Sequence, residues 1–265
     1  SLYLQKLSNL IDSHVNFGHD LLKNDVKRIC KESLNEGIER MLCINSNLHN
    51  FQKDFVLVKD YNFVDISIGH HPNSTDEIET NEIPKLISEH IKFSNNKIVG
   101  IGETGLDYHY QVSKSKQIEC FKLHLELATE YQLPIIVHMR DAEDDMIKIL
   151  SKYRAKLPNV LIHCFTGSQN FAIQCIEMDC YYSLSGIITF KNADTLRNVI
   201  KTLPLNRIIF ETDSPYLTPD PFRGKKNEPK YLKRIIEKYS EIMSIDLEVI
   251  QKESNSNYKK LFQII

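Results

Sequence analysis

The chain alternates between short apolar runs and longer amphipathic segments, and this alternation constrains the fold more than any other feature. The runs are rich in β-branched residues and have the length of buried strands. Eight occur, at residues 9–15, 38–45, 63–70, 97–103, 133–140, 160–165, 181–188 and 207–213. The segments between them have helical patterns; in residues 114–131, for example, Ile118, Phe121, Leu125 and Ala128 fall on one face.

A strand followed by a helix, repeated eight times, predicts an α/β fold in which a parallel sheet closes into a (β/α)₈ TIM barrel. The 265 residues contain no Gly/Ser-rich linker or low-complexity tract, so we expect residues 1–265 to form a single domain. Residues 227–265 are expected to form two helices that close the barrel. A doubly wound open sheet is the structural alternative, because periodicity does not distinguish a closed sheet from an open one.

Composition excludes several classes of protein. No run of eighteen apolar residues spans a bilayer, and the N-terminus lacks the features of a signal peptide, so a cytoplasmic protein that does not bind membranes is expected. Six scattered cysteines without a C-x-x-C pair predict reduced thiols. The net charge of −2 argues against non-specific DNA binding but allows an enzyme that grips a few phosphates locally. A monomer is the default for a self-contained barrel.

Residue types that bind metals end most of the predicted strands. In a TIM barrel the carboxyl-terminal ends of the strands form the active face. Any one such residue has a plain alternative as a hydrogen-bonded structural group. Gathered at one mouth, however, imidazoles and carboxylates would be left unsatisfied without a cation among them. The residues at these ends are His14, His70, His71, Glu103, His138, His163 and Asp213.

The number of candidate ligands favours two metal ions. Glu103 is the natural bridge, because a carboxylate can bind two ions through its two oxygens. We expect Asp213 to bind one metal and to accept a proton from the attacking water, which makes Glu103 and Asp213 the candidate catalytic residues. His14, Glu103 and Asp213 are expected to hold one ion. Glu103, His138 and His163 are expected to hold the other.

Seven segments now show a resemblance to a known family. They are IDSHVN (11–16), GHHP (69–72), GIGETGLDYH (100–109), VHMRDA (137–142), HCFTG (163–167), ETDSPYLTP (211–219) and RGKKNEP (223–229). In this order they resemble the signatures of the TatD family of metal-dependent deoxyribonucleases. The resemblance implies that the substrate is DNA, single-stranded DNA included, and that the enzyme cleaves its phosphodiester bonds, with exonucleolytic cleavage as one mode. It also implies a requirement for two divalent ions of Mg, Mn or Zn.

One position departs from the family pattern. The first motif of the family has two histidines separated by one residue, whereas here Asn16 stands in the second place. An amide oxygen is an uncharged, weaker ligand that suits Mg²⁺ or Mn²⁺ better than Zn²⁺. We therefore expect the ion bound near Asn16 to be held less tightly. His19 is a candidate to compensate, with a role in the loop or at a helix start as the alternative.

Three residues are candidates for binding the substrate. Arg140 lies two residues after His138 on the same side of its strand, and a guanidinium suits a phosphate; an ion pair with a carboxylate is the alternative. His71 could donate to a phosphate oxygen or lock its loop. Arg223 begins a basic cluster, RGKKNEPKYLKR, whose later part is equally well explained as a solvated helix face. Tyr108, Phe165 and Tyr216 could stack on bases or pack in the core.

Two other functions compete with the nuclease. A C–N or ester hydrolase of the same superfamily would share the histidines and the final aspartate. Many such enzymes bridge their ions with a modified Lys, whereas this chain offers Glu103. A barrel that has lost catalysis and serves as a binding protein is the other alternative, and Asn16 keeps it open.

Overall fold

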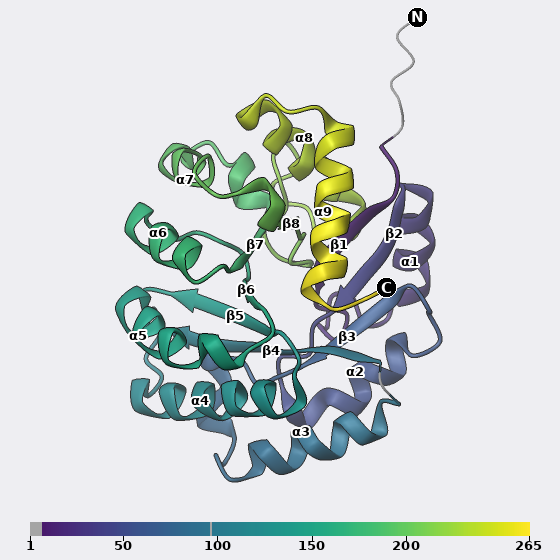
Figure 1. Ribbon diagram of the computed structural model, residues 1–265. Coiled ribbons are helices and arrows are strands. Elements are labelled where there is room, and N and C mark those ends of the chain that lie inside the picture. The colour runs from purple at the N-terminus through teal and green to yellow at the C-terminus, as the bar shows by residue number, and fades with distance from the viewer. Residues whose placement is uncertain (1–6, 96) are drawn as a thin grey trace, which may run out of the picture.

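The computed structural model describes residues 7–95 and 97–265, and within these residues eight parallel strands form one sheet in the order β1 to β8 (Figure 1). A bridge between Val15 and Ser214 joins the two edge strands, and Asp213 N donates to His14 O at 3.0 Å. The TIM barrel is therefore confirmed, and the open-sheet alternative is wrong. The strands are β1 (Leu10–Val15), β2 (Ile38–Cys43), β3 (Val64–Ile68), β4 (Ile98–Asp107), β5 (Ile135–Arg140), β6 (Val160–Ile162), β7 (Tyr181–Leu184) and β8 (Ile208–Phe210).

Helices follow the strands and surround the barrel (Figure 1). They are α1 (Val26–Asn35), α2 (Phe51–Val58), α3 (Glu82–Phe93), α4 (Lys114–Tyr131), α5 (Glu143–Tyr153), α6 (Gln169–Glu177), α7 (Asp194–Ile200), α8 (Leu232–Met243) and α9 (Leu247–Leu261). Helix α4 has the predicted bounds, and Phe121, Leu125 and Ala128 of its predicted apolar face are buried. Ser113 begins it by accepting a hydrogen bond from Lys116 N. None of the helices in the described part of the chain combines the length and apolar character needed to cross a bilayer.

Five strands, namely β2, β3, β6, β7 and β8, end earlier than the sequence predicts. β6 ends at Ile162 and β8 at Phe210, so His163 and Asp213 lie beyond the strands rather than on them. Cys164 and Asp213 adopt φ values of +47° and +57° in the left-handed region, which interrupts the extended backbone there. β4 instead continues four residues beyond its predicted end, to Asp107.

Helix α9 closes the amino-terminal end of the barrel. Its Tyr258 and Leu261, with Phe262, pack against inward-facing apolar residues of the strands, namely Ile11, Leu42, Ile136, Leu161 and Ile209. The hydroxyl of the fully buried Tyr258 donates to Asp65 Oδ2 at 2.7 Å. Arg40 donates to the other oxygen of that carboxylate at 2.8 Å. The predicted pair of helices in residues 227–265 is thus confirmed, and α9 is the one that seals the barrel.

Replacing Tyr258 with Phe should lower the free energy of unfolding by about 1–2 kcal/mol, because Asp65 loses a buried hydrogen-bond donor while the ring still fills its space. Denaturant unfolding followed by circular dichroism measures this change. Tyr131→Phe is the matched control, since the Tyr131 hydroxyl makes no hydrogen bond within residues 7–95 and 97–265. Equal stability of the two variants would show that the Tyr258 hydroxyl does not stabilise the fold.

Candidate metal centre

Polar side chains from the ends of the strands surround one cavity at the carboxyl-terminal mouth of the barrel. The cavity has a volume of about 860 Å³, which lies within the range of small-molecule sites. Its lining includes residues from the carboxyl-terminal part of β4 and β5 and residues that follow the other strands, among them five of the candidate ligands: Asn16, Glu103, His138, His163 and Asp213. The sixth, His14, is buried against Glu103.

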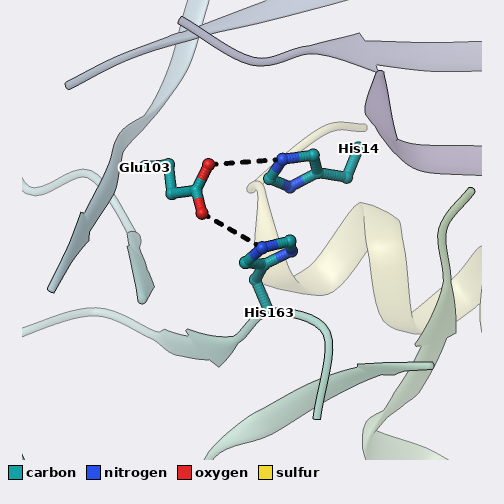
Figure 2. A group of neighbouring side chains, drawn as sticks. All are labelled: His14, Glu103 and His163. Carbon is teal, nitrogen blue, oxygen red and sulfur yellow. Dashed lines mark ion pairs between the residues drawn. The ribbon is translucent and has the colours of Figure 1, made fainter. Parts of the chain in front are cut away.

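Glu103 faces both His14 and His163 and directs one carboxylate oxygen toward each (Figure 2). Its Oε1 is 3.5 Å from His14 Nε2, and its Oε2 is 3.1 Å from His163 Nε2. The two imidazole rings stack with centroids 3.8 Å apart, although β1 and β6 are not neighbours in the sheet. Inward-facing side chains therefore meet across the barrel.

A second group shares the same carboxylate. Glu103 Oε2 is 3.0 Å from His138 Nδ1 and 3.4 Å from His71 Nε2, and the rings of these two histidines are 4.5 Å apart. The structure thus groups the histidines differently from the sequence-based pairing, because His163 lies with His14 and His71 takes its place beside His138. His71, a candidate for substrate binding, faces the bridging carboxylate.

The sequence GETG allows β4 to approach β5 closely. Gly105 has a φ of +146°, and a Cβ on it would lie 2.0 Å from the carbonyl oxygen of His138. Only glycine tolerates both this backbone and this contact. The glycine therefore helps to bring Glu103 and His138 to their short separation.

Two carboxylates that the analysis of strand ends missed hold the histidines in place. Glu211 is fully buried, and its Oε2 is 2.8 Å from His163 Nδ1. Asp107 Oδ2 is 2.8 Å from His138 Nε2. Glu211 begins the motif ETDSP and Asp107 lies in the motif GETGLDY. Their places in these motifs were the sequence feature that could have identified them. Such outer hydrogen bonds fix the orientation of imidazoles that bind metals.

The close packing of these groups shifts their pKa values. Burial alone would raise the pKa of Glu103, but His163, His71 and the hydrogen bond from His138 hold it well below its usual range. Burial disfavours a charged His163, yet Glu211 and Glu103 raise its pKa well above its usual value. The carboxylates thus favour positive charge at this place.

The donor set fits divalent cations. Both ring nitrogens of the buried His14 lack a hydrogen-bond partner within the described residues, although three carboxylates lie 3.3–3.7 Å from them. A buried polar atom without a partner is costly, and a cation between His14 and Glu103 would satisfy it. Two groups have metal-binding geometry in residues 7–95 and 97–265: His14, Glu103 and His163, and His71, Glu103 and His138.

Asp213 and Asn16 lie together at the edge of the first group. Asp213 Oδ1 is 3.3 Å from His14 Nε2, and burial raises the pKa of Asp213 despite the nearby imidazoles of His14 and His163. Asn16 donates through Nδ2 to Asp213 Oδ1 at 3.1 Å and to Ser214 O at 2.9 Å. The amide nitrogen of Asn16, rather than its oxygen, therefore faces Asp213.

The remaining candidates for substrate binding occupy different places. Arg140 borders the cavity, lies 5.7 Å from the ring of Tyr110, and has no carboxylate within salt-bridge distance among the described residues. Arg223 is exposed and does not belong to the cavity lining; its guanidinium carbon lies 3.6 Å from the centroid of the Phe190 ring. Three later cations of the basic cluster, Lys226, Lys230 and Arg234, lie beside carboxylates; Lys230, for example, is 3.4 Å from carboxylate oxygens of Glu32 and Glu228.

Comparisons with known proteins agree with this centre. The model of the family described as "TatD related DNase" matches residues 11–263. A Bacillus subtilis protein named "Uncharacterized metal-dependent hydrolase YabD" is 36% identical over 96% of this chain and 99% of its own length. The protein YcfH of Escherichia coli, named in the same way, is 32% identical over 96% of each chain.

Solved structures share the fold. The crystal structure of YjjV, a TatD homologue from Escherichia coli, superposes with a TM-score of 0.91 at 24% identity and covers 98% of this chain and 100% of its own. A TatD family hydrolase from Entamoeba histolytica gives a TM-score of 0.86 at 22% identity, with 97% and 99% covered. From the family match and the two relatives above 30% identity, the chain belongs to the TatD-related DNase family of metal-dependent hydrolases.

Proposed function

We propose that the protein is a divalent-metal-dependent hydrolase that cleaves the phosphodiester bonds of DNA. One observation carries the proposal: the carboxylate of Glu103 lies within 3.5 Å of imidazole nitrogens from His14, His71, His138 and His163. One carboxylate shared by four histidines at the mouth of a barrel is a ligand set for a pair of ions. The description of the family as a DNase supports DNA as the substrate.

Glu103, His14 and His163 would hold one cation, and Glu103, His71 and His138 the other. When bound, the two cations would neutralise charge on a phosphate and lower the pKa of a nearby water. Glu211 and Asp107 keep the ring nitrogens of His163 and His138 aimed at Glu103 through 2.8 Å hydrogen bonds. This prior alignment reduces the reorganisation that catalysis would otherwise require.

Asp213 is the proposed proton acceptor. It lines the cavity, and its side chain keeps 16% of its surface exposed while Glu103 keeps 6%, so water reaches Asp213 more easily. Asn16 holds Asp213 by donating to its Oδ1. Arg140 is the proposed phosphate-binding residue inside the cavity, and Arg223 lies further out, where a longer strand would pass. A single-domain, monomeric and cytoplasmic protein is part of the same proposal.

Replacing Asp213 with Asn should slow DNA cleavage by roughly 10²–10⁴-fold, the usual contribution of a general base, because the amide cannot accept the proton. The assay follows end-labelled single- and double-stranded DNA with Mg²⁺, Mn²⁺ or Zn²⁺ and with a chelator. Asp60→Asn, on an exposed turn after α2, is the matched control and should cleave at the wild-type rate.

Full activity in Asp213→Asn would remove this residue from the chemistry. Wild-type protein that hydrolyses amides or lactones but not DNA would identify a C–N or ester hydrolase. Wild-type protein that turns over none of these substrates with any of the metals would identify a binding protein.

Replacing Glu103 with Gln should abolish binding of both ions, whereas His138→Ala should abolish binding of one, because only Glu103 belongs to both groups. Elemental analysis after dialysis and titration calorimetry measure the number of bound ions. Glu89→Gln, on the exposed face of α3, serves as the control. Two ions retained by folded Glu103→Gln protein would contradict the shared carboxylate.

Replacing Asn16 with His should tighten the weaker ion on the order of tenfold, about 1.4 kcal/mol, because an imidazole nitrogen can bind a metal, whereas Asn16 turns its amide nitrogen toward Asp213. Calorimetric titration of wild-type protein and Asn16→His with Zn²⁺ and Mn²⁺ measures the two dissociation constants. Two equally tight ions in wild-type protein would contradict the idea of a labile site.

A further inference from the structure

The cavity extends well beyond the metal centre, toward the loops that follow β1 and β2. Gly18, Asn47, Asn50 and Asp54 border it on this side, and we name this part the amide chamber. None of these residues takes part in the chemistry proposed above. The chamber is therefore available for a part of the substrate other than the scissile phosphate.

Asp54, on α2, is the chemically distinctive group of the chamber. Its residue surface is only 8% exposed, and burial raises the pKa of its carboxyl to about 6. Oδ2 accepts a hydrogen bond from Asn45 Nδ2 at 2.9 Å. Oδ1 has no hydrogen-bond partner in the part of the chain that the structure describes. Asp54 is therefore a mostly buried carboxylate with one unpartnered oxygen at the edge of a cavity, and such an oxygen is a strong acceptor for a hydrogen-bond donor.

The surroundings hold Asp54 in this position. Asn45 is itself fixed, since its Oδ1 accepts from Gly69 N at 3.2 Å and its Nδ2 also donates to Asn47 O at 2.8 Å. A Cβ on Gly18 would lie 2.0 Å from Asp54 Oδ1, so a side chain at position 18 would displace this carboxylate. Residues that follow β1 and β2 thus hold the carboxylate of Asp54 in a fixed position at the edge of the cavity.

Charge decides which part of a nucleic acid fits the chamber. A carboxylate repels a phosphate, and the chamber supplies only amide groups beside it. Arg140, the one Lys or Arg of the described residues that borders the cavity, is the last residue of β5, three strands from β2 around the barrel. A phosphate is therefore favoured on the Arg140 side. A neutral group with hydrogen-bond donors is favoured in the amide chamber.

We propose that the amide chamber binds the base of a nucleotide next to the scissile phosphate, and that Asp54 Oδ1 accepts a hydrogen bond from an exocyclic amino group of that base. Cytosine, adenine and guanine carry such an amino group. Thymine presents a carbonyl oxygen where cytosine has its amino group, and two acceptors repel each other. This inference rests on the proposed nuclease function and adds a preference among bases to it.

The test compares a short single-stranded oligodeoxycytidylate with an oligothymidylate, because both contain pyrimidines of nearly equal size. Wild-type protein should cleave the cytosine strand with a kcat/KM about tenfold higher. Asp54→Asn keeps the size of the side chain but can turn a donor toward the chamber, and it should reduce this ratio to about one or reverse it. Asp60→Asn should keep the wild-type ratio.

Each rate is divided by the rate of the same protein on bis(4-nitrophenyl) phosphate, which has no base. A wild-type ratio near one, or an unchanged ratio in Asp54→Asn, would overturn the inference and leave the nuclease proposal intact. No hydrolysis of any phosphodiester by wild-type protein would overturn both.

A second measurement needs no variant and covers the case in which Asp54→Asn does not fold. Deoxycytidine should inhibit wild-type hydrolysis of bis(4-nitrophenyl) phosphate about tenfold more strongly than thymidine. Equal inhibition by the two nucleosides would overturn the role of Asp54 as an acceptor for an amino group.

Discussion

The contact between Glu103 and the imidazoles around it is the constraint on which the rest of the active face depends. A carboxylate buried this deeply is stable only if positive charge or hydrogen-bond donors surround it. The successive donors His14, His71, His138 and His163 are 25 to 67 residues apart in the chain, and a closed barrel is the arrangement that brings them to one carboxylate. Closure of β1 onto β8 therefore stabilises the fold and also assembles the centre.

A second set of carboxylates holds the imidazoles in place, in addition to the carboxylate of Glu103. Glu211 and Asp107 fix the rings of His163 and His138, and Gly105 lets the backbones of β4 and β5 approach. These contacts raise the pKa of both histidines, because acids on two sides outweigh burial. A site with so much fixed negative charge favours cations, and its ligands stand on a rigid frame.

The two walls of the cavity differ in charge. The Arg140 side offers a cation, whereas the amide chamber offers a buried acceptor at Asp54 and neutral amides. Such a division suits a substrate in which charged and neutral parts alternate, as phosphates and bases do along a nucleic acid strand. Asn16 borders the same cavity and donates to Asp213 through its amide nitrogen. Its place in the first motif thus concerns the proposed proton acceptor.

The sequence by itself determined the barrel, because eight apolar runs separated by helical patterns leave few other ways to bury so many strands. It also located the ligand types at the strand ends. Only the tertiary structure decided that His163 stacks on His14, that His71 joins the centre, and that Asp54 borders the cavity. Those pairings depend on how inward side chains cross the barrel and on left-handed backbone turns at Cys164 and Asp213, neither of which the periodicity of a sequence records.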